Sequence, residues 1–156
     1  MRKEYILYTE SVEETVKIGE MLGKLLRPGD VIAMDGDLGA GKTHFTCGIA
    51  KALNIDDYIT SPPFTSVNEY RGGKYPLFHF DVYRLSDSNE LYDIGYDDYA
   101  VQEGIIVIEW SEIVEDIFDE RCIKIDILRR DEKSETSRIV RILMDERADI
   151  IADSVH

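Results

Sequence analysis

The spacing of apolar and polar residues divides the chain into short strands and amphipathic helices. Short apolar runs, or strict alternation of apolar and polar residues, predict strands. The strands expected on these grounds cover residues 4–9, 31–35, 64–70, 75–85, 105–110, 121–130 and 137–144. Apolar residues at helical spacing predict helices over residues 11–26, 42–53, 86–95 and 111–118.

The first of these helices carries an N-terminal signal in its sequence. Ser11 and Glu14 form the S-x-x-E pattern of a capping box, in which side chains satisfy the free N–H groups of the first helical turn. We therefore expect this helix to begin at Ser11.

The order of the elements predicts the class of fold. Strands and helices alternate over the first part of the chain, as in α/β proteins. Residues 71–74 form a hairpin-type turn, and the polar segment 131–136 separates the last two strands, which we expect to pair antiparallel. No linker or internal repeat divides the chain. We expect a single domain over residues 1–156, with a mixed, mostly parallel sheet flanked by helices and an antiparallel C-terminal portion.

A phosphate-binding motif follows the strand at 31–35. Residues 36–43 match G-x-x-x-x-G-K-[ST] in full, and a predicted helix comes directly after them. In such a loop the glycines let successive backbone N–H groups point at one anion. Lys42 supplies the charge that bridges the β- and γ-phosphates, and the Thr43 hydroxyl suits Mg²⁺. The motif predicts a P-loop NTPase whose nucleotide site includes Asp37, Leu38, Gly39, Ala40, Gly41, Lys42 and Thr43.

Two carboxylates stand where such a protein needs one near the metal ion. Glu109 ends the apolar run 105–108, and Asp81 ends a similar run that His79 interrupts. Either can hold Mg²⁺ or orient the attacking water, and either can instead be a simple strand-end residue. We interpret His79 and His44 as structural.

Negative evidence narrows the reaction class. The chain has no N-K-x-D element for guanine, which argues against a GTPase. A small-molecule kinase stays open as an alternative. Such an enzyme would need several arginines in a lid, and the candidate arginines of this chain do not group in that way; they are Arg84, Arg121, Arg129 and Arg130. No arginine finger is evident either, so we expect slow turnover unless a partner completes the site.

The charge balance indicates the kind of partner. With 18 basic and 32 acidic residues, the formal net charge is -14. Because nucleic-acid binding depends on cationic side chains, we expect protein partners rather than direct contact with RNA; solubility alone is the other explanation of the acidity. Cys47 and Cys122 read as buried thiols of a reducing compartment. Without a signal peptide or an apolar run of membrane-spanning length, we expect a cytoplasmic protein and no membrane contact.

Several further motifs occur in series with the phosphate loop. GDLGAGKT, SPPFTSVNEY, HFDVYRL, ELYDIGYDDY and VIEW, in this order, resemble the bacterial tRNA threonylcarbamoyladenosine biosynthesis ATPase family TsaE over residues 5–145. The resemblance implies a P-loop α/β fold and an ATP- and Mg²⁺-dependent ATPase that works with TsaD and TsaB family proteins. The resemblance further implies that these proteins together modify the adenosine next to the anticodon of tRNA. This chain would then reach tRNA only indirectly, through the complex. The alternative is a nucleotide-gated assembly factor in which hydrolysis is incidental.

The resemblance also implies roles for particular residues. The catalytic set is Lys42, Asp81 and Glu109, with Thr43 and Glu109 as Mg²⁺ ligands. The start of the first helix lies near the nucleotide in that family, which places Thr9 and Ser11 close to ATP. Trp110 matches the tryptophan of the family's E-W motif, although by itself it reads as a core or rim aromatic.

The chain departs from the family pattern at one point. Residues 61–64 read S-P-P-F, where the family has S-P-T-F. A role of that threonine is either lost or taken over by Thr60 or Thr65.

Overall fold

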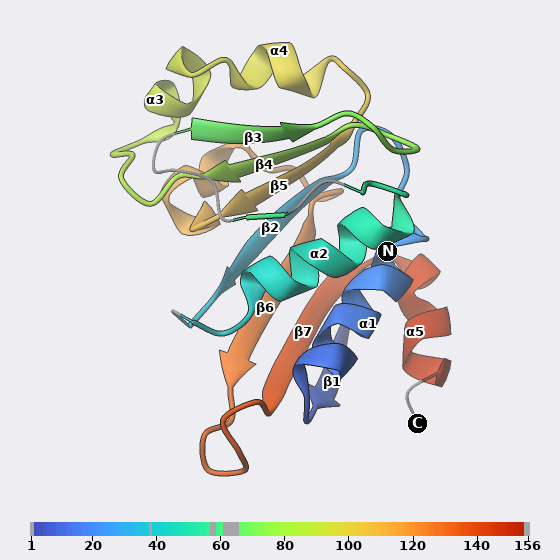
Figure 1. The fold of residues 1–156 in the computed structure, drawn as a ribbon. Coiled ribbons are helices and arrows are strands. Elements are labelled where there is room, and N and C mark those ends of the chain that lie inside the picture. Colours follow the sequence, from blue (N-terminus) through green and yellow to red (C-terminus); the bar gives the residue numbers. More distant parts are fainter. Residues whose placement is uncertain (1, 38, 57–58, 61–65, 155–156) are drawn as a thin grey trace.

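The computed structural model describes residues 2–37, 39–56, 59–60 and 66–154, within which seven strands and several helices lie (Figure 1). The strands are β1 (Lys3–Thr9), β2 (Val31–Gly36), β3 (Ser66–Tyr70), β4 (Leu77–Asp81), β5 (Ile105–Glu109), β6 (Ile123–Arg129) and β7 (Arg138–Met144). The α-helices are α1 (Val12–Gly23), α2 (Lys42–Ala52), α3 (Ser88–Asp93), α4 (Tyr96–Ala100) and α5 (Asp149–Ser154). Two 3-10 helices are η1 (Ser111–Ile117) and η2 (Glu146–Ala148). Each predicted strand is present, but β4 ends at Asp81 whereas the prediction ran to residue 85, and residues 64–65 of the third predicted strand lie outside the described residues.

All seven strands belong to one mixed sheet, in the order β1-β7-β6-β2-β5-β4-β3. β2 is parallel to both of its neighbours, β6 and β5, and β4 is parallel to β5. β7 is antiparallel to β6 and β1, and β3 is antiparallel to β4. The predicted α/β class and the C-terminal antiparallel pair are therefore confirmed. Antiparallel pairing occurs at both edges of the sheet, because the turn at 71–74 adds β3 as a hairpin partner of β4.

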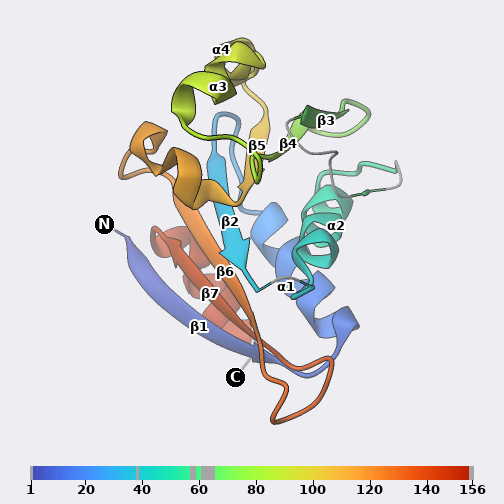
Figure 2. The same ribbon diagram turned by 90° about the vertical axis from the view of Figure 1, so that its left-hand side faces the viewer.

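The sheet separates two buried apolar clusters. One joins α1, α2 and α5 to the strands and includes Leu22, Phe45 and Ile125. The other lies between β4, β5 and the layer of α3, α4 and η1, and includes Phe80 and Ile108. Figure 2 shows α1 and α2 on one side of the sheet and η1, in orange, on the other. Because successive side chains of a strand face opposite sides, β4 and β5 must be apolar along most of their length.

The start of α1 has the predicted cap with one change. The Ser11 hydroxyl accepts the N–H of Glu14 at 3.1 Å. The Glu14 carboxylate accepts the N–H of Glu10 at 3.3 Å, one residue earlier than in the standard capping box.

The short helices differ most from the sequence prediction. The short helix predicted over residues 111–118 is present as the 3-10 helix η1. α4 and α5 were not predicted, because elements of five or six residues give too little periodic signal. Within the part of the chain that the structure describes, no helix has the length and apolar character needed to cross a membrane.

Candidate nucleotide-binding site

The glycine-rich loop leaves β2 at Gly36 and enters α2 at Lys42. Gly36 has a φ of 141°, and a Cβ atom there would lie 2.0 Å from the carbonyl oxygen of Ile127 on β6. Gly41 has a φ of 99° and is the N-cap of α2. A residue with a side chain would be strained at both positions. The two fixed glycines of the motif therefore place the loop against β6 and turn the chain into a helix N-terminus, where backbone N–H groups suit an anion.

The loop is also held from outside by β6 and β7. The N–H of Asp37 donates to the Ile127 carbonyl at 3.2 Å, and the Asp37 carboxylate accepts the N–H of Arg129 at 3.0 Å. Arg138 Nε donates to the carbonyl oxygen of Ala40 at 2.7 Å. Arg138 was not identified from the sequence, because 98 residues separate it from Ala40 and no motif links them. These contacts fix the loop, and they use the N–H of Asp37; the N–H of Ala40 also donates within the loop, to the Asp37 carbonyl at 3.1 Å.

Lys42 extends from the loop toward the ends of β4 and β5. Its side chain is 7% exposed, and its ammonium group lies 3.4 Å from the carbonyl oxygen of Gly36. The same nitrogen lies 4.5 Å from the centroid of the Trp110 ring. A buried ammonium group needs such partners, and an aromatic face attracts a cation. The lysine is thus held inside the pocket rather than in solvent.

The two candidate carboxylates lie side by side. Asp81 and Glu109 are register partners at the ends of the parallel strands β4 and β5, and are 6% and 4% exposed. Asp81 Oδ1 accepts the N–H of Tyr83 at 2.9 Å. Burial raises the pKa of Asp81 above its ordinary value, and the nearby Glu109 charge raises it further, against the lowering effect of the Tyr83 hydrogen bond. The residue pattern alone left these carboxylates as alternatives, the family resemblance implied a role for both, and the structure brings both to one place.

His79 on β4 forms a hydrogen bond with Glu109 on the neighbouring strand β5. It is fully buried on β4, and its Nε2 lies 2.5 Å from Glu109 Oε2. Its Nδ1 has no hydrogen-bond partner among the residues that the structure describes. We assign the neutral tautomer in which Nε2–H donates to the carboxylate, since any other state would bury an unpaired N–H donor. The interpretation of His79 as structural gave no partner for it, because the β4–β5 register could not be read from the sequence.

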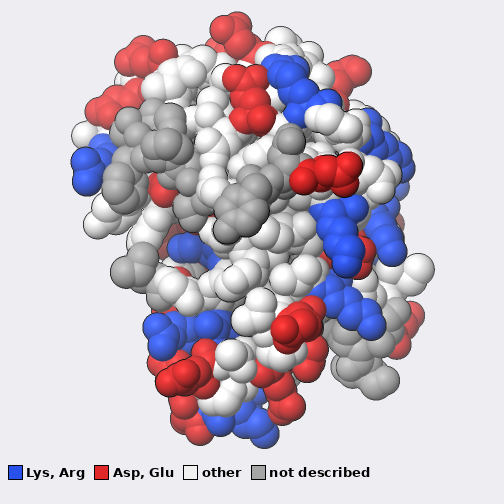
Figure 3. All heavy atoms as spheres, viewed as in Figure 1, with Lys and Arg blue, Asp and Glu red and all other residues white. Residues whose placement is uncertain are grey.

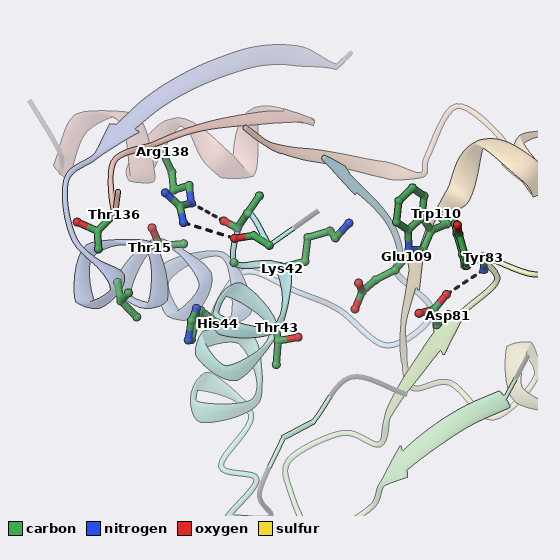
Figure 4. Close-up of a pocket in the computed structure, with 14 residues that line it drawn as sticks. Thr15, Lys42, Thr43, His44, Asp81, Tyr83, Glu109, Trp110, Thr136 and Arg138 are labelled. Carbon is green, nitrogen blue, oxygen red and sulfur yellow. Dashed lines mark hydrogen bonds between the residues drawn. The ribbon is translucent and has the colours of Figure 1, made fainter. Parts of the chain in front are cut away.

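These groups share one pocket of about 660 Å³, a size typical of small-molecule sites (Figure 4). Asp81, Glu109, Tyr83 and Trp110 line one end of it, and Thr15, Thr136 and Arg138 line the other, with Lys42 and Thr43 between them. Val12 is also part of the lining.

The predicted nucleotide-binding residues divide into two groups. Gly39, Ala40, Gly41, Lys42 and Thr43 line the pocket. Ser11 and Asp37 do not, because the Ser11 hydroxyl caps α1 and the Asp37 carboxylate binds the backbone of β6. Thr9 is buried, with its hydroxyl 2.8 Å from that of Thr15. From the first turns of α1, Val12 and Thr15 line the pocket instead. Leu38 and residues 61–65 lie outside the described residues.

The oxygen atoms in this pocket suit a magnesium ion whose other ligands are phosphate and water. Among the described residues, no group of three or more histidine, cysteine or acidic side chains could form a protein-only metal site. The pocket does hold the Thr43 hydroxyl and the carboxylates of Glu109 and Asp81. Mg²⁺ commonly takes only one or two carboxylates from a protein, and the rest of its ligands from water and substrate phosphates.

The mixed sheet and the glycine-rich loop between β2 and α2 define a protein of the P-loop NTPase fold class. The family model "Threonylcarbamoyl adenosine biosynthesis protein TsaE" matches residues 9–140. The chain therefore belongs to the TsaE family.

Individual relatives agree with this assignment. The chain is 41% identical to the tRNA threonylcarbamoyladenosine biosynthesis protein TsaE of Bacillus subtilis, over 78% of this chain and 75% of that protein. It is also 41% identical to the protein of the same name from Aquifex aeolicus, over 82% of this chain and 97% of the relative. The crystal structure of Bacillus subtilis YdiB is similar with a TM-score of 0.78 and 31% identity, covering 99% of this chain and 95% of that one.

Proposed function

We propose that this protein is a Mg²⁺-dependent ATPase that supports threonylcarbamoyladenosine modification of tRNA. Membership of the TsaE family supports the role in threonylcarbamoyladenosine biosynthesis. The observation that carries the ATPase proposal is the convergence of four groups in one pocket: Lys42 and Thr43 from the loop, and Asp81 and Glu109 from two strand ends.

Each of these residues has a distinct task in the proposed reaction. The loop N–H groups hold the β-phosphate, and the Lys42 ammonium neutralises charge on the β- and γ-phosphates. Thr43 and Glu109 would hold Mg²⁺, which would neutralise charge that develops on the phosphates. Asp81 orients the attacking water or couples the γ-phosphate to the segment 61–68. The rate comes from positioning and charge stabilisation rather than from a covalent intermediate.

His79 and Arg138 support these residues without touching the phosphates. The His79 N–H fixes one oxygen of the Glu109 carboxylate, which leaves the other oxygen for the metal ion. Arg138 holds the carbonyl side of the loop. In this proposal the γ-phosphate lies at the Asp81 and Glu109 end of the pocket, and the nucleoside occupies the end lined by Thr15 and Thr136.

The charge distribution supports partners that are basic proteins. Residues 85–120 contain twelve of the 32 acidic residues and no lysine or arginine. This segment forms α3, α4 and η1 as well as β5, and Figure 3 shows acidic side chains over the α3 and α4 end of the molecule. Such a surface repels tRNA and attracts complementary proteins. We propose TsaD and TsaB family proteins as these partners, with tRNA reached only through the complex.

Steady-state ATP hydrolysis, measured with and without a TsaB–TsaD pair, tests the proposal. We expect Mg²⁺-dependent phosphate release that rises when the pair is added. The Asp81→Asn variant separates hydrolysis from gating: if it binds ATP, does not hydrolyse it, and still sustains modification, the protein is an assembly factor. Transfer of labelled γ-phosphate to an acceptor other than water would instead identify a kinase.

A further inference from the structure

Trp110 has an unusual backbone conformation for a residue with a large side chain. Its φ of 61° and ψ of 39° lie in the left-handed region, which residues with a Cβ atom rarely adopt. This turn brings the indole ring to 4.5 Å from Lys42 Nζ and to 4.8 Å from the ring of Tyr83. All three side chains line the pocket (Figure 4). A conformation that the residue itself disfavours must be held by its surroundings.

Asp35 contacts this turn from the strand that leads into the phosphate loop. It precedes Gly36 in β2, and its carboxylate binds Ser111, the residue after Trp110. Oδ1 accepts the N–H of Ser111 at 2.7 Å, and Oδ2 accepts the hydroxyl hydrogen of the same residue. Ser111 is 4% exposed, so water cannot readily replace these bonds. Hydrogen bonds to a charged acceptor are among the stronger ones in proteins.

We propose that Asp35 is a positioning residue that fixes the left-handed turn at Trp110 and thereby keeps the indole ring over Lys42. Asp35 is not part of the pocket lining, so it acts through Ser111 and Trp110 and not on the nucleotide. The role of the ring, which is to cover the lysine that neutralises the phosphates, rests on the proposed function. The position of the ring is a separate matter and can be measured without nucleotide.

Fluorescence tests the position of the ring directly, because Trp110 is the only tryptophan in the chain. We would measure the emission maximum and acrylamide quenching in the absence of nucleotide. Loss of the hydrogen bonds to the Asp35 carboxylate should make the left-handed turn at Trp110 about tenfold less favoured. Asp35→Ala is therefore expected to shift the emission to the red and to raise the quenching constant. In Asp35→Asn, the amide oxygen can still accept the N–H of Ser111, and the amide NH₂ can donate to the Ser111 hydroxyl oxygen. This variant should therefore behave like the wild type.

Asp126 provides a matched control. It is the register partner of Asp35 on β6, is half-buried, and makes no hydrogen bond to Ser111. Asp126→Ala should leave emission and quenching unchanged. If Asp35→Ala matches the wild type, or if Asp126→Ala changes the quenching as much, the proposal is wrong. Should circular dichroism show that Asp35→Ala does not fold, Ser111→Ala decides, because it loses the bond to Oδ2 and must also raise the quenching constant.

A double-mutant cycle tests whether Asp35 acts through Trp110. We expect Asp35→Ala and Trp110→Ala to lower kcat/KM for ATP, and the double variant to be no worse than Trp110→Ala alone. Additive losses would show that Asp35 acts by another route and would overturn the proposal. If even the wild type hydrolyses no ATP, the proposed function fails, while the quenching comparison still decides the role of Asp35.

Discussion

The carboxylates at the ends of β4 and β5 are held very differently from those around α5 at the opposite edge of the sheet. Asp81 and Glu109 are buried next to each other, and burial raises the pKa of Asp81. At the α5 edge, Arg147 Nε donates to Asp145 at 2.9 Å, and this bond lowers the pKa of Asp145. The pKa of Asp149 is also lowered, first by its hydrogen bond from Tyr5.

In the proposed function, this difference separates charges that stabilise the fold from charges that take part in the reaction. A paired carboxylate near the surface favours the folded state modestly. Two buried carboxylates side by side disfavour it, unless a cation joins them. The chain accepts this cost at Asp81 and Glu109, where Lys42 and the phosphate loop face the same pocket. Four predictions test the distinction, beginning with the largest effect.

Lys42→Ala should cause the largest loss of activity. The variant removes the cation that shares the pocket with the strand-end carboxylates and that, in the proposed function, neutralises the phosphates. We expect kcat/KM for ATP to fall by about 100- to 1000-fold, the range for removing one charge-stabilising group. Phosphate release under steady-state conditions measures this. The control is Lys3→Ala at the α5 edge, where Lys3 pairs with Asp149 at 3.3 Å. Equal activity of Lys42→Ala and Lys3→Ala would contradict the account.

Glu109→Gln should lower turnover but leave nucleotide binding largely intact. Glutamine can still accept the hydrogen bond from His79, yet it carries no charge for Mg²⁺. We expect kcat to fall by about 100-fold, with a smaller change in ATP affinity. Titration of turnover against Mg²⁺ concentration is the measurement. Glu4→Gln, which breaks the exposed pair with Arg141, is the control and should retain wild-type turnover. Unchanged turnover in Glu109→Gln would remove Glu109 from the site.

Asp81→Asn should stabilise the protein while it abolishes hydrolysis. Because the pKa of Asp81 is raised in the folded state, ionisation at neutral pH costs stability, and the cost grows as pH rises above the ordinary carboxyl pKa. Asparagine removes this cost and can still accept the N–H of Tyr83. We expect a higher Tm than wild type at neutral pH, and a gain that disappears in acid, where the wild-type carboxyl is also neutral. A lower Tm at neutral pH would contradict this explanation.

Asp145→Asn should have the smallest effect, and in the opposite direction. The pKa of Asp145 is lowered in the folded state, so its pairing stabilises the protein at neutral pH, and this stability is lost as pH falls through the ordinary carboxyl pKa toward the folded value. The Asp145 side chain is 36% exposed, so solvent weakens the pair. We expect a loss of about 1 kcal/mol or less, which corresponds to about 2–4 °C or less in Tm. ATP hydrolysis should not change.

Local patterns in the sequence were sufficient to predict most of the fold. Apolar runs and alternation located the strands, and the polar turns predicted the β3–β4 and β6–β7 hairpins. The phosphate loop was identified because its chemistry depends on glycines, a lysine and a threonine at fixed spacing. The short helices α4 and α5 were missed, since they depend on packing against the sheet more than on their own periodicity.

The contacts that shape the site could not be predicted in the same way. The His79–Glu109 bond depends on the register of β4 against β5. The Arg138 bond to the phosphate loop and the Asp35 bond to Ser111 join residues 98 and 76 positions apart. Each arises only when the sheet is assembled, and no short motif encodes it. The sequence therefore predicts candidate residues for the chemistry, whereas the structure is needed to find the residues that hold them in place.

Binding of Mg-ATP to the wild-type protein and to Lys42→Ala, measured by isothermal titration calorimetry, tests the central claim most directly. The claim is that the phosphate loop and Lys42 gather a triphosphate onto a chain with a net charge of -14. We predict a saturable heat of binding for the wild type and its loss in the variant. Absence of binding by the wild type, alone and with the TsaB–TsaD pair present, would contradict the account.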